Sequence, residues 1–408
     1  MKALLIINIC LGAIFLLCYF YQIIYLFVAY IAGVKKYPDA EPKRLAILIA
    51  ARNEERVISN LIGSLMEQDY PRERFDVFVV ADNCTDGTAK IAKQAGAIVY
   101  ERFNNKEVGK GYALNYLIGE IETDFGADFY DAYIVFDADN TAEKNYLTEM
   151  NKAFSAGYDV VTSYRNASNY DTNWRSAGQG MYFLRDARVL NLARTRLGAN
   201  NYVTGTGFLF SRELCKKYGG WPFHTLTEDG EFTMHNAVNG ARCAYCNDAV
   251  FYDEQAVDAK TSWNQQRRWC RGGLQIFKLY LPRLTRGMFS KNFLSCFDTA
   301  SCLASAYFIS MFAVLINTVA TVILLATGTH PLEILAVVIP GILFAYFSLL
   351  IFSVPLTISE WDRIEGKRGK KILYAFTFPL FIFSFIPAAF VTIFKPAKWK
   401  KIEHGKKQ

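Results

Sequence analysis

The stretch Tyr133-Ile134-Val135-Phe136-Asp137-Ala138-Asp139 decides the fold predicted for this chain of 408 residues. Its four apolar residues are typical of a strand that is buried on both faces of a sheet. Similar strand-like runs occur at Leu45–Ala50, Asp76–Val80 and Ile98–Tyr100. Segments with helical periodicity separate these runs, at Glu54–Gln68, Thr85–Ala95 and Lys110–Glu120. Strands that alternate with helices at this spacing predict a parallel α/β sheet.

Polar residues follow three of the predicted strands at the point where each strand ends. Asn53 and Glu54 come after the first strand, Asp82 after the second, and Asp137 and Asp139 after the fourth. The carboxyl ends of parallel strands meet at one edge of a sheet, and ligands bind there. We therefore expect these side chains to converge on one site.

Asp137 and Asp139 are two carboxylates separated by one residue. A hard divalent cation such as Mg²⁺ or Mn²⁺ is held by one or two carboxylates together with phosphate oxygens. Such an ion neutralises the charge that develops on a diphosphate leaving group. An acidic turn without a ligand is the alternative, and the position directly after a buried strand favours the metal site.

Thr227-Glu228-Asp229 stands at the start of a predicted helix over Asp229–Val238. One interpretation is an N-cap followed by first-turn carboxylates, which favour the helix dipole. The other is a catalytic motif in which Asp229 is the general base that takes the proton from an acceptor hydroxyl. The motif alone leaves both interpretations open.

Gln265, Arg268 and Trp269 share one face of a predicted helix over Trp263–Phe277, because their spacing is i, i+3, i+4. The planar guanidinium of Arg268 suits a diphosphate, and the indole of Trp269 can lie against an acceptor sugar. An interfacial aromatic residue beside a snorkelling Arg is the alternative. The complete Q-x-x-R-W pattern, after Thr227-Glu228-Asp229, favours a diphosphate- and acceptor-binding role.

Three further segments complete the polar part of the chain. Trp174–Arg196 has the pattern of a long helix, and Tyr202–Phe210 is strand-like around Gly205-Thr206-Gly207. Lys278–Ser295 mixes apolar and basic residues, as an amphipathic helix at a membrane interface does.

Four stretches carry no charged residue, at 3–34, 299–332, 334–359 and 372–394. Each is long enough for a spanning helix, which needs about 20 residues. The first is too long for a signal peptide and has no small-residue cleavage site, so we expect a retained helix. The predicted organisation is an N-terminal transmembrane helix at 1–36, a polar domain at 37–270, amphipathic interface helices at 271–298 and a C-terminal membrane region at 299–408.

Basic residues flank the apolar stretches, at Lys35-Lys36, in the loop 360–371 and in the tail Lys395–Lys407. Because basic loops stay on the cytosolic side, we expect a cytosolic polar domain at the plasma membrane, in contact with anionic headgroups. Three simple crossings would place the tail outside. Either the tail breaks the tendency, or the last segment, which contains Pro379 and Pro387, is broken or re-entrant.

The composition argues against other classes of protein. The net charge of +7 is modest, and no basic face interleaved with aromatic residues predicts nucleic-acid binding. Nine scattered cysteines fit reduced thiols in the cytosol. Cys243 and Cys246 fall on opposite faces of a strand, and no second pair completes a zinc site.

Together the three motifs resemble those of membrane-embedded, processive-type family 2 glycosyltransferases, such as cellulose, chitin, hyaluronan and poly-N-acetylglucosamine synthases. The likeness extends in order over residues 1–408, and the combination of motifs is specific. It implies a GT-A (Rossmann-like) glycosyltransferase domain with an α-helical transmembrane bundle. It also implies a UDP-sugar donor, Mg²⁺ or Mn²⁺, inversion at the anomeric carbon and a β-linked product.

The resemblance also implies roles for single residues. Asn53-Glu54 matches the uridine contact after the first strand, Asp82 the aspartate that meets the nucleoside, and Lys110 a lysine near the diphosphate. Gly205-Thr206-Gly207 matches the segment near the terminal sugar of the acceptor. Arg52 stands where the family usually has an aromatic residue, which is a departure at the position that stacks on uracil.

The leading hypothesis is a synthase that extends a β-glucan from UDP-glucose and moves the polymer through its own helices. Tyr202–Phe208 resembles the V-G-T-G segment of plant cellulose-synthase-like enzymes more than the S-G-P segment of hyaluronan synthases, which favours glucose. A poly-N-acetylglucosamine, chitin or hyaluronan synthase is the alternative within the class. A non-processive lipid glycosyltransferase is the alternative from another class, because ceramide glucosyltransferases also carry D-x-D and R-W motifs. A non-catalytic scaffold or transporter would not require all three motifs.

Overall fold

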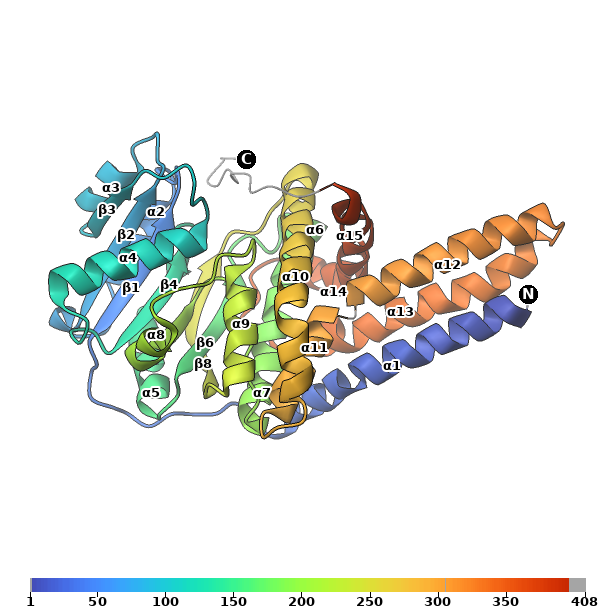
Figure 1. Cartoon of the computed structure of the whole chain (residues 1–408), viewed down its shortest axis with the longest axis horizontal. Coiled ribbons are helices and arrows are strands. Elements are labelled where there is room, and N and C mark those ends of the chain that lie inside the picture. The colour runs from blue at the N-terminus through green and yellow to red at the C-terminus, as the bar shows by residue number, and fades with distance from the viewer. Residues whose placement is uncertain (1, 305, 396–408) are drawn as a thin grey trace.

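The computed structural model describes residues 2–304 and 306–395, so the expected basic tail falls outside the described residues except for Lys395. A sheet covered by helices forms one part of the molecule, and long helices project from it to one side (Figure 1). Helix α10 (Ala259–Gly287) stands between the sheet and the projecting helices (Figure 1).

Within the described residues the strands form one eight-stranded sheet in the order β3-β2-β1-β4-β7-β6-β8-β5. Their bounds are β1 (Leu45–Ala51), β2 (Phe75–Asp82), β3 (Ile98–Arg102), β4 (Ala132–Asp137), β5 (Thr141–Ala142), β6 (Val160–Ala167), β7 (Phe208–Ser211) and β8 (Cys243–Asp253). The predicted parallel pairing holds for β3, β2, β1 and β4. Beyond β4 the sheet is mixed, because β7 runs antiparallel to both β4 and β6, and β5 antiparallel to β8.

Helices cover both faces of the parallel half. Alternate residues of β1 point to opposite faces, so Leu45, Ile47 and Ile49 pack with α2 (Ile58–Met66). Ala46 and Leu48 pack with α4 (Lys110–Phe125) on the other face. The remaining elements of this part are η1 (Arg72–Arg74), α3 (Thr88–Gln94), α5 (Tyr146–Ser155), α8 (Arg212–Tyr218) and α9 (Glu228–Asn239). In β8, Cys243 and Cys246 lie in the cores of opposite faces, as predicted.

The expected strand over Tyr202–Phe210 is wrong for its first six residues, because only Phe208–Ser211 forms β7. Gly205 and Gly207 have φ values of +87° and +63°, in the left-handed region that no strand residue adopts. The loop that results turns beside the carboxyl end of β4, where the amide of Gly207 donates to the carbonyl of Val135 at 2.9 Å.

The long helix expected over Trp174–Arg196 is present in three consecutive parts. These are α6 (Trp174–Leu184), the π-helical segment η2 (Arg185–Asn191) and α7 (Leu192–Leu197). The widened turns of a π-helix often occur at functional sites, and η2 faces the projecting helices.

A single helix, α10, covers the region where two were expected, at Trp263–Phe277 and within Lys278–Ser295. A second helix, α11 (Phe293–Ala304), begins only after a turn. The projecting helices are α1 (Lys2–Ile31), α12 (Ala306–Ala326) and α13 (Pro331–Ser359), followed by α14 (Arg368–Phe383) and α15 (Phe385–Phe394).

Four helical stretches of the described chain are long and apolar enough to cross a membrane: Lys2–Ile31, Ile309–Ala326, Pro331–Ser359 and Arg368–Phe394. The last differs from the others. In its most apolar 18-residue window, 39% of the residues are buried within the protein. The corresponding shares for the first three stretches are 6%, 0% and 11%. It also breaks between α14 and α15 at Ser384, whose hydroxyl accepts a hydrogen bond from Gln266 of α10 at 2.7 Å. The structure therefore has the break that Pro379 and Pro387 suggest.

A buried polar cluster fastens α1 to α7 and α11. Arg194 of α7 donates two hydrogen bonds to the carboxylate of Asp298 in α11, at 2.6 and 3.0 Å. Tyr21 and Tyr25 of α1 donate to the same carboxylate at 3.0 and 3.3 Å. Arg194 and Asp298 are only 2% and 1% exposed, so the pair is fully desolvated and each charge depends on the other.

Candidate active site

Lys110 joins the D-x-D turn, Asp137-Ala138-Asp139, to the glycine loop, Gly205-Thr206-Gly207. It begins α4, pairs with the carboxylate of Asp137 at the end of β4, and donates to the carbonyl of Gly205 at 2.7 Å. Burial opposes the charge of Lys110, but the carboxylates of Asp137, Glu228 and Asp229 outweigh it and raise the pKa of Lys110. Burial also acts against the Asp137 carboxylate, yet the Lys110 ammonium keeps the pKa of Asp137 below its usual range. The site therefore has a fixed cation at its centre.

The D-x-D turn is held by Thr206. The amide of Asp137 donates to the Thr206 hydroxyl at 2.9 Å, and that hydroxyl hydrogen bonds to the side-chain oxygen of Asn140. Asn140 in turn donates to the carboxylate of Asp139 at 3.3 Å. Thr206 is 3% exposed, so it supports the turn from within the fold and does not face the site.

The D-x-D carboxylates fit a divalent cation that shares its ligands with phosphate. No third Asp, Glu, His or Cys joins Asp137 and Asp139 in a cluster among the residues that the structure describes. Mg²⁺ is typically bound by one or two protein carboxylates, and its other ligands are phosphate oxygens and water. The hard oxygen donors of this turn match that preference.

Glu228 and Asp229 occupy the first turn of α9, next to the glycine loop. A Cβ atom on Gly205 would stand 3.4 Å from Oδ2 of Asp229. Burial raises the pKa of Glu228 to about 7, and the neighbouring Asp229 carboxylate adds to the shift. Burial also raises the pKa of Asp229, although the amide of Gly230 and the guanidinium of Arg268 oppose this. Two carboxyl groups with raised pKa values next to a fixed cation are suited to proton transfer.

The N-cap interpretation of Thr227 is only partly met. Thr227 occupies the N-cap position of α9, but its side chain makes no capping hydrogen bond, and its Oγ1 is buried without a partner among the described residues. The loop before α9 is held by Glu231, whose carboxylate accepts the amides of His224 and Thr225 at 3.1 and 3.0 Å. Glu231 was not predicted, although a Glu in the first helical turn is a sequence signal for such a contact.

One face of α10 holds the loop that leads into α9. Arg268 donates to the carbonyl of Leu226 at 3.0 Å, and Gln275 accepts the amide of the same residue at 3.1 Å. Between them, Gly272 lies against Thr227, where a Cβ atom would stand 2.6 Å from Cγ2. Arg268, Gly272 and Gln275 are spaced i, i+4, i+7, so the helix presents all three to this loop.

The other two residues of the Q-x-x-R-W motif point elsewhere. Trp269 stacks with Tyr182 and Phe385, at ring centroid distances of 6.4 and 6.0 Å and interplanar angles of 14° and 15°. Gln265 has its side-chain oxygen buried without a partner among the described residues. The motif therefore does not form one surface. Arg268 contacts the loop that leads into α9, and Trp269 lies in an aromatic stack between α6 and α15.

The predicted nucleotide contacts lie at the ends of β1 and β2. Asn53 adopts a φ of +60°, and its side chain accepts the amide of Thr85 at 2.7 Å. The amide of Glu54 donates to the hydroxyl of Thr88 at 2.8 Å. Asp82 accepts a hydrogen bond from Arg102 at 2.8 Å, in a pair that is 7% exposed on each side. These contacts join the two strand-end loops, which places the residues at one edge of the sheet as expected.

Arg165 of β6 is a further residue of the site that no motif predicts. It donates to the carbonyl of Thr204 at 2.6 Å and pairs with the carboxylate of Asp253 in β8. Its guanidinium lies 3.5 Å from the centre of the Phe183 ring. Arg165 therefore fixes the start of the glycine loop from the mixed half of the sheet. Gly207, at the other end of the loop, packs so tightly against Phe251 that a Cβ atom would overlap the ring.

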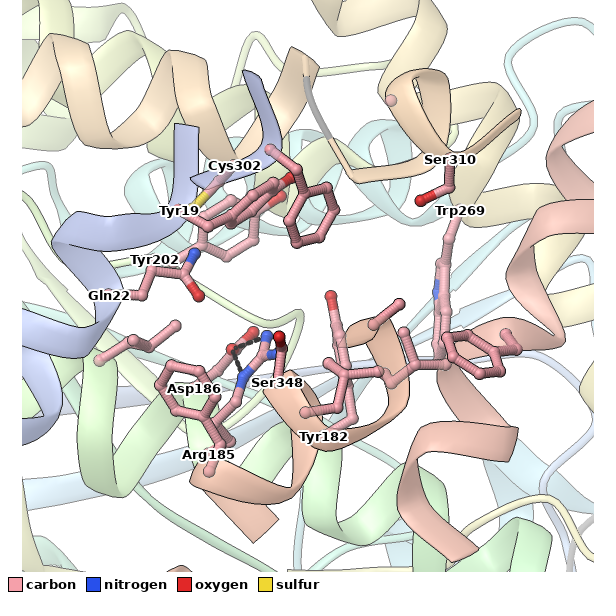
Figure 2. Close-up of a pocket in the computed structure, with 18 of the residues that line it drawn as sticks. Tyr19, Gln22, Tyr182, Arg185, Asp186, Tyr202, Trp269, Cys302, Ser310 and Ser348 are labelled. Carbon is pink, nitrogen blue, oxygen red and sulfur yellow. Dashed lines mark hydrogen bonds and ion pairs between the residues drawn. The ribbon is translucent and has the colours of Figure 1, made fainter. Parts of the chain in front are cut away.

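A cavity of about 380 Å³ opens beside Asp229 and extends between the projecting helices. Its lining near the site includes Thr204, Thr227, Asp229 and Trp269. Farther along it is lined by apolar and aromatic side chains of four helices, among them Phe15, Phe20, Ile23, Phe344, Leu349, Phe352, Ile382 and Ile386. Figure 2 shows Trp269 and Tyr182 on one side of this space and Tyr19, Gln22 and Tyr202 on the other. The lining connects Asp229 to the apolar part of the molecule.

Comparisons with known proteins agree on one class of enzyme. The sequence model of the family described as "Glycosyltransferase like family 2" matches residues 42–272. The chain is 28% identical over 243 residues to the Beta-monoglucosyldiacylglycerol synthase of Synechocystis sp., covering 58% of this chain and 49% of that protein. This chain thus spans about half the length of that curated relative. It is 25% identical over 399 residues to the Probable glycosyltransferase YdaM of Bacillus subtilis, covering 89% and 87% of the two chains.

A solved structure shares the fold over nearly the whole chain. The mannosyltransferase PcManGT of Pyrobaculum calidifontis, solved with GDP-Man and Mn²⁺, superposes with a TM-score of 0.62 at 17% sequence identity. The superposition covers 95% of this chain and 99% of the other. At this identity the likeness shows a common GT-A-like fold.

Proposed function

This chain belongs to the glycosyltransferase-like family 2, and we propose that it transfers a sugar from a nucleotide-sugar donor to a hydroxyl group of a membrane lipid. One observation carries the proposal. The cavity beside Asp229 leads away from the strand-end donor edge and continues between apolar helices. An acceptor that enters from this side meets the candidate base with its polar end while its apolar part stays among Phe, Leu and Ile side chains.

The residues of the site provide the parts of an inverting transfer. Asp229 takes the proton of the acceptor hydroxyl as its oxygen bonds to the anomeric carbon, and the bond from that carbon to the diphosphate breaks. Lys110 and Arg268 place positive charge beside the leaving diphosphate. Asp137 and Asp139 would hold Mg²⁺ or Mn²⁺, which when bound supplies further charge neutralisation for the diphosphate. Asn53, Glu54 and Asp82 lie where the nucleoside of a UDP-sugar would bind.

A glycosylated lipid replaces the β-glucan polymer as the favoured product. A hydrated glycan chain needs a channel with many hydrogen-bonding groups, whereas the far part of this cavity is lined mainly by apolar side chains. The name of the Synechocystis relative supports the same choice, because it describes transfer of glucose to a diacylglycerol. The aromatic stack at Trp269 could also hold the sugar ring of a growing polymer. The experiment below must therefore distinguish a polymer from a glycosylated lipid.

The membrane arrangement is part of the proposal. We place 1–36 and 299–408 in or at the membrane, the catalytic domain at 37–270 on its cytosolic face, and the segment 271–298 along the surface. The upright position of α10 between the sheet and the projecting helices supports this arrangement (Figure 1). The break at Ser384 and the burial of α14 and α15 against the soluble part support a last segment that does not fully cross.

The test is a radiolabel assay on the purified full chain in lipid vesicles. UDP-glucose, UDP-N-acetylglucosamine, UDP-glucuronate and UDP-galactose are each offered with Mg²⁺ or Mn²⁺, and the products are separated by organic extraction and by size. Label in the organic phase that carries one or two sugars supports the proposal. High-molecular-weight label that a β-glucanase degrades would return the enzyme to the polysaccharide synthases.

A further inference from the structure

Few charged side chains line the cavity beside Asp229, which we call the acceptor cavity. Among the described residues, the charged side chains of the lining are Arg185, Asp186, Arg194 and Asp229. Two of these are cations and two are carboxylates. The remaining lining is apolar or carries neutral polar groups, such as Gln22, Tyr202, Thr204, Ser310 and Ser348.

Arg185 is held by the residue next to it. Its Nε and Nη2 atoms donate to the same carboxylate oxygen of Asp186, at 3.2 and 2.7 Å. The pair is 14% and 8% exposed, and the guanidinium lies over the ring of Tyr182 at 5.1 Å from its centre. Figure 2 shows the pair in the wall of the cavity, close to Ser348. A ligand that took Arg185 for itself would leave a desolvated carboxylate behind, which is strongly unfavourable.

Arg194 is engaged on all its sides. Two of its nitrogens bind the carboxylate of Asp298, and a third donates to the side-chain oxygen of Asn191 at 2.9 Å. The other cations of the active site do not line the cavity. Lys110 is engaged by the D-x-D turn, Arg165 by Asp253 and Arg268 by the carbonyl of Leu226. No cation of the lining is therefore left over for an anionic headgroup within the described residues, while Asp229 presents a carboxylate to it.

We propose that the acceptor is a lipid whose headgroup carries hydroxyl groups but no net charge, and that the Arg185–Asp186 pair enforces this selection. The inference rests on the proposed lipid glycosyltransferase activity and specifies its acceptor class. A headgroup phosphate would meet the field of Asp229 in a partly desolvated space, where both cations of the lining are already paired with other carboxylates. A hydroxyl-bearing neutral headgroup can hydrogen bond to Tyr202, Thr204 and Gln22 without this cost.

Tyr202 supplies a geometric reason for the hydroxyl. Its phenol oxygen would stand 3.1 Å from a Cβ atom placed on Gly230, the residue that follows Asp229. Burial raises the pKa of Tyr202, and the Asp229 carboxylate raises it further. The phenol therefore stays protonated beside the candidate base, where it can hydrogen bond to an acceptor oxygen.

The test compares acceptors that differ in charge. Full-length protein is reconstituted in phosphatidylcholine vesicles that contain diacylglycerol, phosphatidylglycerol or a polyprenyl phosphate. Phosphatidylserine, whose headgroup has neither a free hydroxyl nor a terminal phosphate, keeps the surface charge equal in all vesicles. We expect transfer to diacylglycerol to exceed transfer to either anionic lipid at least about tenfold.

Substitutions then test the pair itself. Asp186→Asn frees the charge of Arg185, so the preference for the neutral acceptor should fall severalfold. The double variant Arg185→Gln/Asp186→Asn removes both charges and should restore the preference, which also shows whether the cavity still folds. Glu213→Gln is the matched control, because Arg212 and Glu213 form a similar pair of sequence neighbours at 2.8 Å on the surface.

The outcomes separate the two proposals. Equal or better use of an anionic acceptor by the wild type would overturn the inference and leave the lipid glycosyltransferase standing. An unchanged preference in a folded Asp186→Asn variant would overturn the role of the pair. A product that is never lipid-soluble, with any acceptor, would instead overturn the proposed function.

Discussion

Gly272 of α10 and Thr227 at the start of α9 lie so close that a Cβ atom on Gly272 would stand 2.6 Å from Cγ2 of Thr227 and nearer still to its hydroxyl oxygen. This approach places the helix of the Q-x-x-R-W motif directly against the loop of the Thr227-Glu228-Asp229 motif. Arg268 and Gln275 bind Leu226, the residue before Thr227, through its carbonyl and its amide. The two motifs are therefore packed directly against each other, although about 35 residues separate them in the sequence.

Gly272→Ala should reduce sugar transfer at least about tenfold. Although Ala favours a helix by about 1 kcal/mol over Gly, the added methyl group pushes α10 from Thr227, and overpacking of this kind costs about 1–3 kcal/mol. Transfer rate and thermal unfolding temperature are the measurements. Gly119→Ala in α4 is the control, because nothing lies within 4 Å of its Cβ position. Full activity of Gly272→Ala would contradict the contact.

Asp229→Asn should lower the turnover number by about 10²–10⁴, the usual contribution of a general base. Binding of the donor nucleotide should change little, since the substitution keeps the shape of the side chain. The comparison is turnover against donor affinity, measured by equilibrium binding of UDP. Asp248→Asn, on the surface beside Lys36, should leave both unchanged. Unaltered transfer by Asp229→Asn would refute the assignment of the base.

The thermal stability of the soluble part should fall as pH rises from about 4.5 to about 7. Burial raises the pKa of Glu228 from 4.5 to about 7 in the folded state, so the native protein binds more protons than the unfolded chain in this window. Ionisation of Glu228 then costs about 3 kcal/mol of stability above pH 7. Glu228→Gln should remove this loss, which unfolding temperatures measured between pH 4.5 and 8 would show. A variant as pH-sensitive as the wild type would contradict the assignment to Glu228.

Chelation of divalent cations should abolish transfer, and added Mg²⁺ or Mn²⁺ should restore it. Asp139→Asn weakens the D-x-D ligand set, so the cation concentration that gives half-maximal activity should rise at least about tenfold. The contact between Lys110 and Asp137 does not involve Asp139, so it should survive in this variant. Activity that persists in excess EDTA would show that the ammonium of Lys110 and the guanidinium of Arg268 suffice without a metal.

Trp269→Ala should raise the KM for the acceptor more than it changes the affinity for UDP. The indole lines the cavity and stacks on Tyr182 and Phe385, all of which lie away from the strand-end donor edge. Trp269→Phe retains the stack and should recover most of the loss. A larger effect on UDP binding than on the acceptor would place Trp269 on the donor side.

Much of the fold was predictable because buried parallel strands leave a strong local signal. Runs such as Leu45–Ala50 and Tyr133–Phe136 are apolar throughout, and each is followed by polar residues that must meet at the carboxyl edge. The mixed half of the sheet has no such signal. Strand β7 has four residues, and the left-handed glycines before it interrupt the alternation that would predict its direction.

The site divides in the same way. Asp137, Asp139, Asp229 and Arg268 belong to motifs whose spacing is visible in the chain, and the structure brings all of them to one region. Arg165, Glu231 and Gln275 hold the loops through backbone carbonyls and amides. Any residue type with the right hydrogen-bonding group can do this, so no short pattern marks them.

The sequence by itself determined the class of chemistry, because carboxylates and basic groups of fixed type and spacing survive as local patterns. It also determined the apolar helices, because their length and composition are local. Only the tertiary structure decided what the acceptor side is made of. The cavity beside Asp229 is built from α1, η2, α10, α13 and the broken pair α14 and α15, segments that are up to several hundred residues apart. Whether such a space is wet or apolar, and whether Arg185 and Arg194 are available or engaged, depends on packing between these segments, which no one segment encodes.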